Sequence, residues 1–282
     1  MKKKQSQESQ NKNHKVIVFG NQKGGIGKTF STLAVASKKS LSGEKILIVD
    51  LDSGGHATSS LLPESDLDTN FQTILEISQG RVHIEEAIIS SKISRVDLLP
   101  ADQRIKNIDD FYVNKNPAFI AKNMIKDIAS FYDLIFFDVG PSFSRVISSA
   151  YLAADIVFIP ITPDTYSIEA ATCTVQSLLD ACFEWRVQIP TIKIFFNRFT
   201  TRNSSLFAEE FVKKSSLAKF YSGIKLPETT TALHAINQKD FFLKKVSSET
   251  GRELRNGIEN LAKIVSLNNK ILNRGALENE IH

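Results

Sequence analysis

The sequence predicts a doubly wound α/β fold, in which a mostly parallel sheet carries helices on both faces. Three observations lead to this prediction. Short runs of Ile, Val, Leu and Phe alternate along the chain with stretches whose apolar residues recur at helical spacing. The runs are nearly continuous, as in strands buried on both faces of a parallel sheet. A glycine-rich segment separates the first run from the first helical stretch.

The expected elements follow this alternation through the chain. The expected strands are residues 16–20, 45–50, 96–99, 134–138, 156–160 and 192–196. The expected helices are residues 29–41, 118–130, 144–153, 167–184, 204–215, 230–238 and a long one from about 250 to 272. Residues 1–14 are almost wholly polar and are expected to form a disordered tail. Residues 15–282 are expected to form a single domain, since 282 residues with 42% hydrophobic content can bury a large core.

Composition excludes several classes of protein. The two cysteines, Cys173 and Cys182, lack C-x-x-C spacing, so a disulfide framework or a zinc site has no support. No apolar run reaches the roughly 18 residues of a membrane span, and no signal peptide is evident, so we expect a cytoplasmic protein. The net charge is +4, with the basic excess at both ends of the chain. This asymmetry indicates nucleic acid or an anionic membrane, but solvated charged faces would explain it equally.

The glycine-rich segment reads Lys23-Gly-Gly-Ile-Gly-Lys28-Thr29 and has the features of a phosphate-binding loop. Its glycines let the backbone adopt φ > 0 and bring N–H groups close to phosphate oxygens at a helix N-terminus. Lys28 would reach the β- and γ-phosphates, and Thr29 would offer its hydroxyl to Mg²⁺. The strict pattern G-x-x-x-x-G-K-[ST] would require glycine where Gln22 stands. The expected nucleotide-binding residues here are Lys23, Gly24, Gly25, Ile26, Gly27, Lys28, Thr29 and Phe30.

With its additional lysine, Lys23, this segment resembles the deviant Walker A loop of the ParA/MinD family. The resemblance covers residues 16 to about 240. It implies an ATP-bound homodimer in which Lys23 reaches the nucleotide of the other subunit. Phe30 stands where family members usually have a second hydroxyl for the α-phosphate, and we expect the loop backbone to serve instead.

Two carboxylates at predicted strand ends complete the expected catalytic set. Asp52 follows the second strand, and its segment is similar to the family motif Asp-x-Asp-Pro-Gln-Gly-Asn, whose second Asp positions or activates the attacking water. Here residues 53–56, Ser-Gly-Gly-His, replace Pro-Gln-Gly-Asn. Asp138 ends an apolar strand in the form of a Walker B motif, which would hold a Mg²⁺-bound water opposite Thr29.

The later part of the chain supplies candidates for the adenine and for DNA. Asn197, Pro227 and Thr229 fall where family members place adenine contacts, and ordinary strand-end and turn chemistry would also explain them. Glu228 stands where ParA proteins often have a basic residue that helps to bind DNA. The alternative candidates for phosphate contacts are Lys213, Lys214, Arg252, Arg255 and Lys263.

The resemblance implies a ParA-like partition ATPase that uses ATP and Mg²⁺. We expect it to dimerise with ATP, to bind double-stranded DNA without sequence preference, and so to associate with the nucleoid. A ParB-like centromere-binding protein would stimulate slow intrinsic hydrolysis, in which Lys23, Lys28 and Asp52 act catalytically.

Three alternatives remain open at this stage. A MinD-like membrane ATPase would need a C-terminal amphipathic anchor, but the acidic end of the chain opposes binding to anionic lipid, and a packing helix fits better. An iron–sulfur carrier would need paired cysteines, and a bacterial tyrosine kinase a Tyr-rich tail. A nucleotide-dependent scaffold would not need Asp52.

Overall fold

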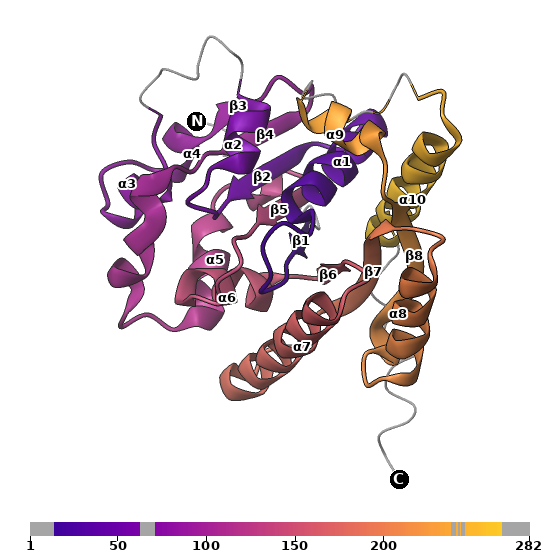
Figure 1. The fold of residues 1–282 in the computed structure, drawn as a ribbon. Helices are drawn as coiled ribbons and strands as arrows, with labels where there is room; N and C mark the ends of the chain where they lie inside the picture. The colour runs from indigo at the N-terminus through magenta and orange to yellow at the C-terminus, as the bar shows by residue number, and fades with distance from the viewer. Residues whose placement is uncertain (1–13, 63–70, 238–240, 242, 244–245, 267–282) are drawn as a thin grey trace, which may run out of the picture.

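The structure, a computed structural model, describes residues 14–62, 71–237, 241, 243 and 246–266. Within these residues an eight-stranded sheet has the order β3-β4-β2-β5-β1-β6-β7-β8 (Figure 1). The strands are β1 (Lys15–Phe19), β2 (Ile46–Asp50), β3 (Ile89–Ser90), β4 (Val96–Leu99), β5 (Leu134–Asp138), β6 (Ile156–Ile161), β7 (Thr191–Phe199) and β8 (Tyr221–Pro227). Every neighbouring pair is parallel except β3 with β4. The prediction of a mostly parallel sheet is confirmed.

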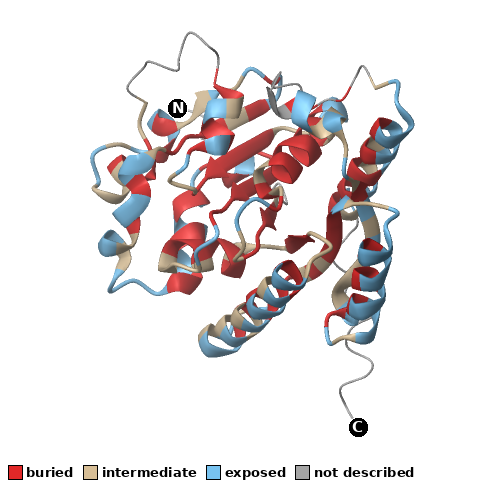
Figure 2. Cartoon of the chain, in the orientation of Figure 1, coloured by how far each residue is buried: buried red, intermediate tan, exposed pale blue. Residues whose placement is uncertain are grey.

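Helices cover both faces of the sheet, which confirms the doubly wound arrangement. The α-helices are α1 (Lys28–Leu41), α2 (His56–Leu61), α3 (Ile74–Ser78), α4 (Ile84–Ala87), α5 (Pro117–Ile125), α6 (Arg145–Ala153), α7 (Thr165–Trp185), α8 (Asn203–Lys214), α9 (Thr230–Asn237) and α10 (Glu249–Ser266). The 3₁₀ helices are η2 (Gln103–Tyr112), η3 (Ala129–Phe131) and η4 (Ala218–Phe220). Buried side chains of α1, α2, α9 and α10 form one core, and those of α5, α6, α7 and α8 form the other. Figure 2 shows the buried sheet between these partly exposed layers.

The six predicted strands are all present, but the sequence prediction missed β3 and β8. Strand β8 lies at the sheet edge, is mostly half-buried, and contains Gly223 with a φ of 75°, so it lacks the apolar run of a central strand. The prediction of a continuous helix over 118–130 was wrong. Helix α5 ends at Ile125, and η3 brings the chain back to β5.

Helix α10 packs its apolar stripe into the core, as the packing-helix prediction expected. Ile258, Leu261 and Val265 are buried against the sheet face that α1 also covers. Among the residues that the structure describes, none of the helices combines the length and apolar character that crossing a bilayer requires. Three predicted segments lie outside the described residues: the tail up to residue 13, residue 238 at the end of the helix predicted over 230–238, and residues 267–272.

The parallel arrangement brings the residues of the candidate site together at the edge of the sheet that the carboxyl ends of its strands form. The carboxyl ends of β1, β2 and β5 lie side by side there, and Asp50 is the register partner of Asp138. In doubly wound sheets, ligands bind at the carboxyl ends of the strands. The glycine-rich loop, which leads from β1 into α1, belongs to this edge.

Candidate functional site

The glycine-rich loop is held in place by a buried asparagine of β7, Asn197. Gly27 has a φ of 89°, and a Cβ atom on it would lie 2.1 Å from the Asn197 side-chain nitrogen. That nitrogen, Asn197 Nδ2, donates a hydrogen bond to the Ile26 carbonyl oxygen at 2.8 Å. Position 27 therefore requires glycine for its backbone conformation and for the close approach of Asn197. Sequence reasoning assigned Asn197 to the adenine and missed this contact.

The lysine and the hydroxyl that follow the loop lie beside Asp138. Lys28 is buried, and its Nζ donates to the Lys23 carbonyl oxygen at 2.9 Å. Burial lowers the pKa of the Lys28 ammonium, while the carboxylates of Asp138 and Asp52 oppose this shift. Thr29 Oγ1 donates to Asp138 Oδ2 at 2.8 Å. The structure thus brings together Lys28, Thr29, Asp52 and Asp138.

A further carboxylate, Asp50, lies in this cluster and was not assigned by sequence reasoning. Asp50 and Asp138 are both fully buried at the ends of adjacent strands. Burial, followed by the neighbouring Asp50 charge, raises the pKa of Asp138 to about 8, although hydroxyls of Thr29 and Thr32 favour its charged form. Burial likewise raises the pKa of Asp50 to about 6. The motif Asp50-Leu-Asp52 was the available sequence signal.

Asp52 lies in the loop between β2 and α2. Its side chain packs against Gly140, two residues after the end of β5. The Gly54 N–H donates to Asp52 Oδ1 at 3.0 Å. A Cβ atom on Gly140 would lie 3.3 Å from Asp52 Cγ. A side chain at position 140, near the end of β5, would therefore crowd the Asp52 carboxylate.

Lys23 is held by an ion pair with the N-cap residue of a distant helix. Its Nζ lies 2.6 Å from Asp164 Oδ1, and Asp164 also caps α7 by accepting from the Ser167 N–H. Burial opposes the charge of Asp164, but hydrogen bonds from Lys23, Thr162 and Ser167 prevail and lower the pKa of Asp164. Sequence reasoning did not identify Asp164, because it lies 141 residues from Lys23. A hollow of about 500 Å³ adjoins this pair and is lined by Gly24, Gly25, Arg198, Arg202 and Glu228, among others.

Phe30 contributes its side chain to the core rather than to the site. Phe30 belongs to α1, and its ring is buried in the core on that side of the sheet. The ring lies 6.3 Å, centroid to centroid, from the ring of Phe241. Only the Phe30 backbone is left for a ligand at the helix N-terminus. Pro227 ends β8, and the Thr229 hydroxyl lies within 3.3 Å and 3.4 Å of the Thr231 and Thr250 hydroxyls.

The basic residues proposed for DNA do not form one patch. Lys213 and Lys214 lie at the end of α8 and pair with Glu209 and Glu210 of the same helix. The other candidates, Arg252, Arg255 and Lys263, lie on α10, which packs on the opposite face of the sheet. Arg255 Nη2 donates to the Leu243 carbonyl oxygen at 2.5 Å, and Lys263 Nζ donates to Asn260 Oδ1 at 3.1 Å.

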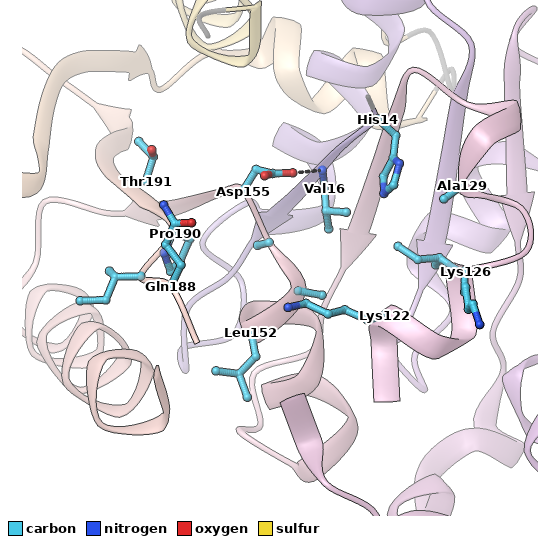
Figure 3. A pocket seen from close by; sticks show the side chains of 14 residues that line it. His14, Val16, Lys122, Lys126, Ala129, Leu152, Asp155, Gln188, Pro190 and Thr191 are labelled. Carbon is cyan, nitrogen blue, oxygen red and sulfur yellow. Dashed lines mark hydrogen bonds between the residues drawn. The ribbon is translucent and has the colours of Figure 1, made fainter. Parts of the chain in front are cut away.

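A second hollow, of about 470 Å³, lies at the opposite edge of the sheet, where β1, β6 and β7 begin. Figure 3 shows its lining, in which Asp155 accepts a hydrogen bond from the Val16 N–H at 2.8 Å. Lys122 of α5 and Lys126, which directly follows that helix, line another part of it. This hollow is separated from the glycine-rich loop by the length of the strands, so it is not part of the nucleotide site.

The residues at the loop fit a nucleoside triphosphate with Mg²⁺. The Thr29 hydroxyl and the Asp138 carboxylate lie side by side and provide hard oxygen donors, which this ion prefers. Gly25 and Gly27 have positive φ, and Gly27 is the N-cap residue of α1. The loop therefore ends at the N-terminus of α1, where backbone N–H groups can bind phosphate.

Comparison with known proteins decides the family. A family model described as an AAA domain matches residues 14–182, which is more than half of the chain. The chromosome-partitioning ATPase Soj of Treponema pallidum is 27% identical over 201 residues, covering 71% of this chain and 77% of that protein. The chain belongs to the ParA/MinD family. Another family relative, the cell division protein PomZ of Myxococcus xanthus, is 31% identical over 170 residues, or 58% of this chain and about half of PomZ (52%).

The fold of the ParA/MinD family is also evident in solved structures. The ATP complex of a McdA variant from Cyanothece superposes with a TM-score of 0.78, at 19% identity, over 90% of this chain and 97% of that one. At this identity the likeness establishes the fold alone.

The two buried carboxylates predict how stability depends on pH. The pKa of Asp138 in the folded chain, about 8, lies above the ordinary value of about 4 in an unfolded chain. Stability from this group is therefore fully present below pH 4 and is lost as the pH rises through 8. Asp138→Asn should raise the melting temperature of the nucleotide-free chain at pH 8 by a few degrees, since 1 kcal/mol corresponds to roughly 2–4 °C in a chain of this size.

Thermal unfolding between pH 5 and pH 9, without Mg²⁺ or nucleotide, measures this effect. The exposed Asp127→Asn is the matched control and should follow the wild-type profile. An Asp138→Asn profile parallel to wild type over this range would contradict the assignment of a raised pKa to Asp138.

Proposed function

We propose that this chain is a ParA-like partition ATPase that binds Mg·ATP and dimerises around it. The observation that carries the proposal is the cluster at the loop, in which Lys28, Thr29, Asp52 and Asp138 meet at the carboxyl edge of the sheet. Similarity to the chromosome-partitioning ATPase Soj supports partition as the cellular role, and similarity to PomZ, a cell division protein, is consistent with it. The dimer then binds non-specific double-stranded DNA, and a ParB-like protein stimulates slow hydrolysis that releases it.

In this mechanism each side chain has one task. Lys28 leaves the Lys23 carbonyl oxygen and contacts the β- and γ-phosphates, where it offsets the charge that develops during phosphoryl transfer. Asp52 orients the attacking water from the loop after β2. Mg²⁺, held through Thr29 and Asp138, would neutralise charge on the phosphate oxygens. Asn197 keeps the loop backbone in place through the Ile26 carbonyl oxygen.

Lys23 has to exchange one partner for another in this proposal. In the monomer its ammonium pairs with Asp164, with both side chains about a third exposed. Exposed ion pairs contribute only about 0–1 kcal/mol, so the phosphates of a bound nucleotide compete readily for Lys23. Asp164 thus holds the Lys23 side chain at the edge of the site until a second subunit with bound ATP associates.

Asp52→Ala should bind ATP as tightly as wild type but lose turnover, because the water is no longer oriented. We expect a fall in kcat of at least about 100-fold, comparable to the loss of one transition-state contact of about 2.7 kcal/mol. Phosphate release and equilibrium binding of a fluorescent ATP analogue measure the two properties separately. Lys28→Ala serves as the reference that loses binding. Turnover at the wild-type rate in Asp52→Ala would place the water-orienting group elsewhere.

Lys23→Ala should spare ATP binding by the monomer while weakening the ATP dimer and hydrolysis. The effect should act in trans, so mixing Lys23→Ala with Lys28→Ala should restore part of the activity. Such a heterodimer has one occupied site, on the Lys23→Ala subunit, and receives Lys23 from its partner. Phosphate release and sedimentation of the mixed and separate variants measure this. If Lys23→Ala alone dimerises and turns over like wild type, the lysine has no role across the interface.

DNA binding should require ATP, lack sequence preference and weaken steeply with salt. Replacing Lys213, Lys214, Arg252 and Arg255 together by Ala should reduce the slope of log affinity against log salt by about 0.9 for each DNA phosphate that the variant no longer neutralises. The control replaces Lys122 and Lys126, exposed lysines on and directly after α5, and should keep the slope. An unchanged slope in the fourfold variant would show that DNA binds another surface.

Binding to liposomes, measured beside binding to DNA, distinguishes the MinD-like alternative. The described part of α10 buries its apolar stripe, which leaves no apolar face there for lipid. Binding to anionic liposomes in the presence of ATP, with none to random-sequence DNA, would nevertheless favour that alternative over the partition ATPase.

A further inference from the structure

The loop that carries Asp52 is fastened to the neighbouring strand by one threonine. Thr58, near the start of α2, is buried, and its Oγ1 accepts a hydrogen bond from the Ala101 N–H at 2.8 Å. Ala101 lies two residues after β4, the strand next to β2 in the sheet. The same hydroxyl donates to Asp50 Oδ2 at 2.7 Å. Thr58 therefore joins the ends of β2 and β4.

The carboxylate of Asp50 extends this chain of hydrogen bonds to the loop that carries Asp52. Its Oδ2 atom also accepts from the Thr58 N–H at 2.9 Å, and its Oδ1 atom accepts from the Asp52 N–H at 3.0 Å. Hydrogen bonds to a charged acceptor are about twice as strong as neutral ones. Networks of this kind fix one geometry when all their members are satisfied. The backbone of Asp52 is thus set by contacts that begin at Ala101.

A close backbone approach, independent of Thr58, confines the same loop beside the same residue, Ala101. Gly55 has a φ of 58°, and a Cβ atom on it would lie 2.8 Å from the Ala101 carbonyl oxygen. The loop passes too close to Ala101 for any side chain at position 55. Residues 53–56, which differ from the family motif, are therefore held between Asp50 on one side and Ala101 on the other.

We propose that Thr58 is a positioning residue for ATP hydrolysis, acting through Asp50 on the placement of Asp52. Its hydroxyl, bonded on one side to Ala101 and on the other to Asp50, sets where the Asp52 carboxylate stands relative to Lys28 and Asp138. The inference rests on the proposed function, in which Asp52 orients water. Small displacements of such a group lower the rate of the chemical step without weakening substrate binding.

A purely structural role of Thr58 makes a different prediction. If the hydroxyl only satisfied a buried N–H group, its removal would lower stability, and any loss of activity would follow the loss of folded protein. A positioning role lowers kcat in chain that is folded and binds nucleotide normally. The value of kcat per nucleotide-binding site therefore separates the two, since a purely structural role leaves it unchanged and a positioning role lowers it.

The test uses the full chain with Thr58→Val, which keeps the shape of threonine but lacks the hydroxyl. We expect kcat to fall at least about tenfold, while the Kd for a non-hydrolysable ATP analogue changes less than about twofold. Thr58→Ser retains the hydroxyl and should restore most of the rate. Ser59→Ala, an exposed position on the same helix, is the matched control and should behave as wild type. Melting temperatures identify the variants that are folded.

Gly55→Ala tests the same clamp without touching Thr58 and carries the test if Thr58→Val does not fold. It should show the same loss of kcat with retained affinity. Wild-type turnover in the folded variants, or an equal loss of kcat and affinity, would overturn the inference while Asp52→Ala remains inactive. A wild-type chain without turnover, or an active Asp52→Ala variant, would overturn the proposed function and this inference with it.

Discussion

The candidate site depends on the burial of two carboxylates at the ends of adjacent strands. Asp50 and Asp138 are register partners and are fully buried, so each carboxyl group needs hydrogen-bond partners within the protein in place of water. The hydroxyls of Thr29 and Thr32 contact Asp138, and Thr58 contacts Asp50. These threonines begin α1 and α2, so both helices are fixed to the sheet at the point where the proposed chemistry takes place.

Much of the fold could be predicted because its strands are central. Their apolar runs are long enough to stand out, and glycines mark the loop between β1 and α1. Strand β8 could not be predicted, since an edge strand is half-buried and needs no apolar run. The placement of Lys28, Thr29 and Asp138 also followed from the motif, because parallel strands bring their carboxyl ends to one edge.

Contacts between residues far apart in sequence were beyond prediction. Neither the partner of Lys23 nor the contact of Asn197 with Ile26 leaves a local pattern, since each depends on how the strands are ordered. The basic residues of α8 and α10 illustrate the same limit. Their charges can be counted in the sequence, and the spacing of Lys213 and Lys214 from the acidic residues of the same helix is local, but only the fold reveals that the two helices belong to opposite layers.

The contact between Asn197 and the loop has a consequence for how the protein is made. It joins residues 171 positions apart, and β1 pairs with β5 and β6 rather than with any strand close to it in sequence. Contacts of this range form slowly, and a growing chain cannot make them until the later residues have left the ribosome. The loop at residues 23–29 is therefore synthesised among the first residues of the described chain but acquires its support only after residue 197 has emerged.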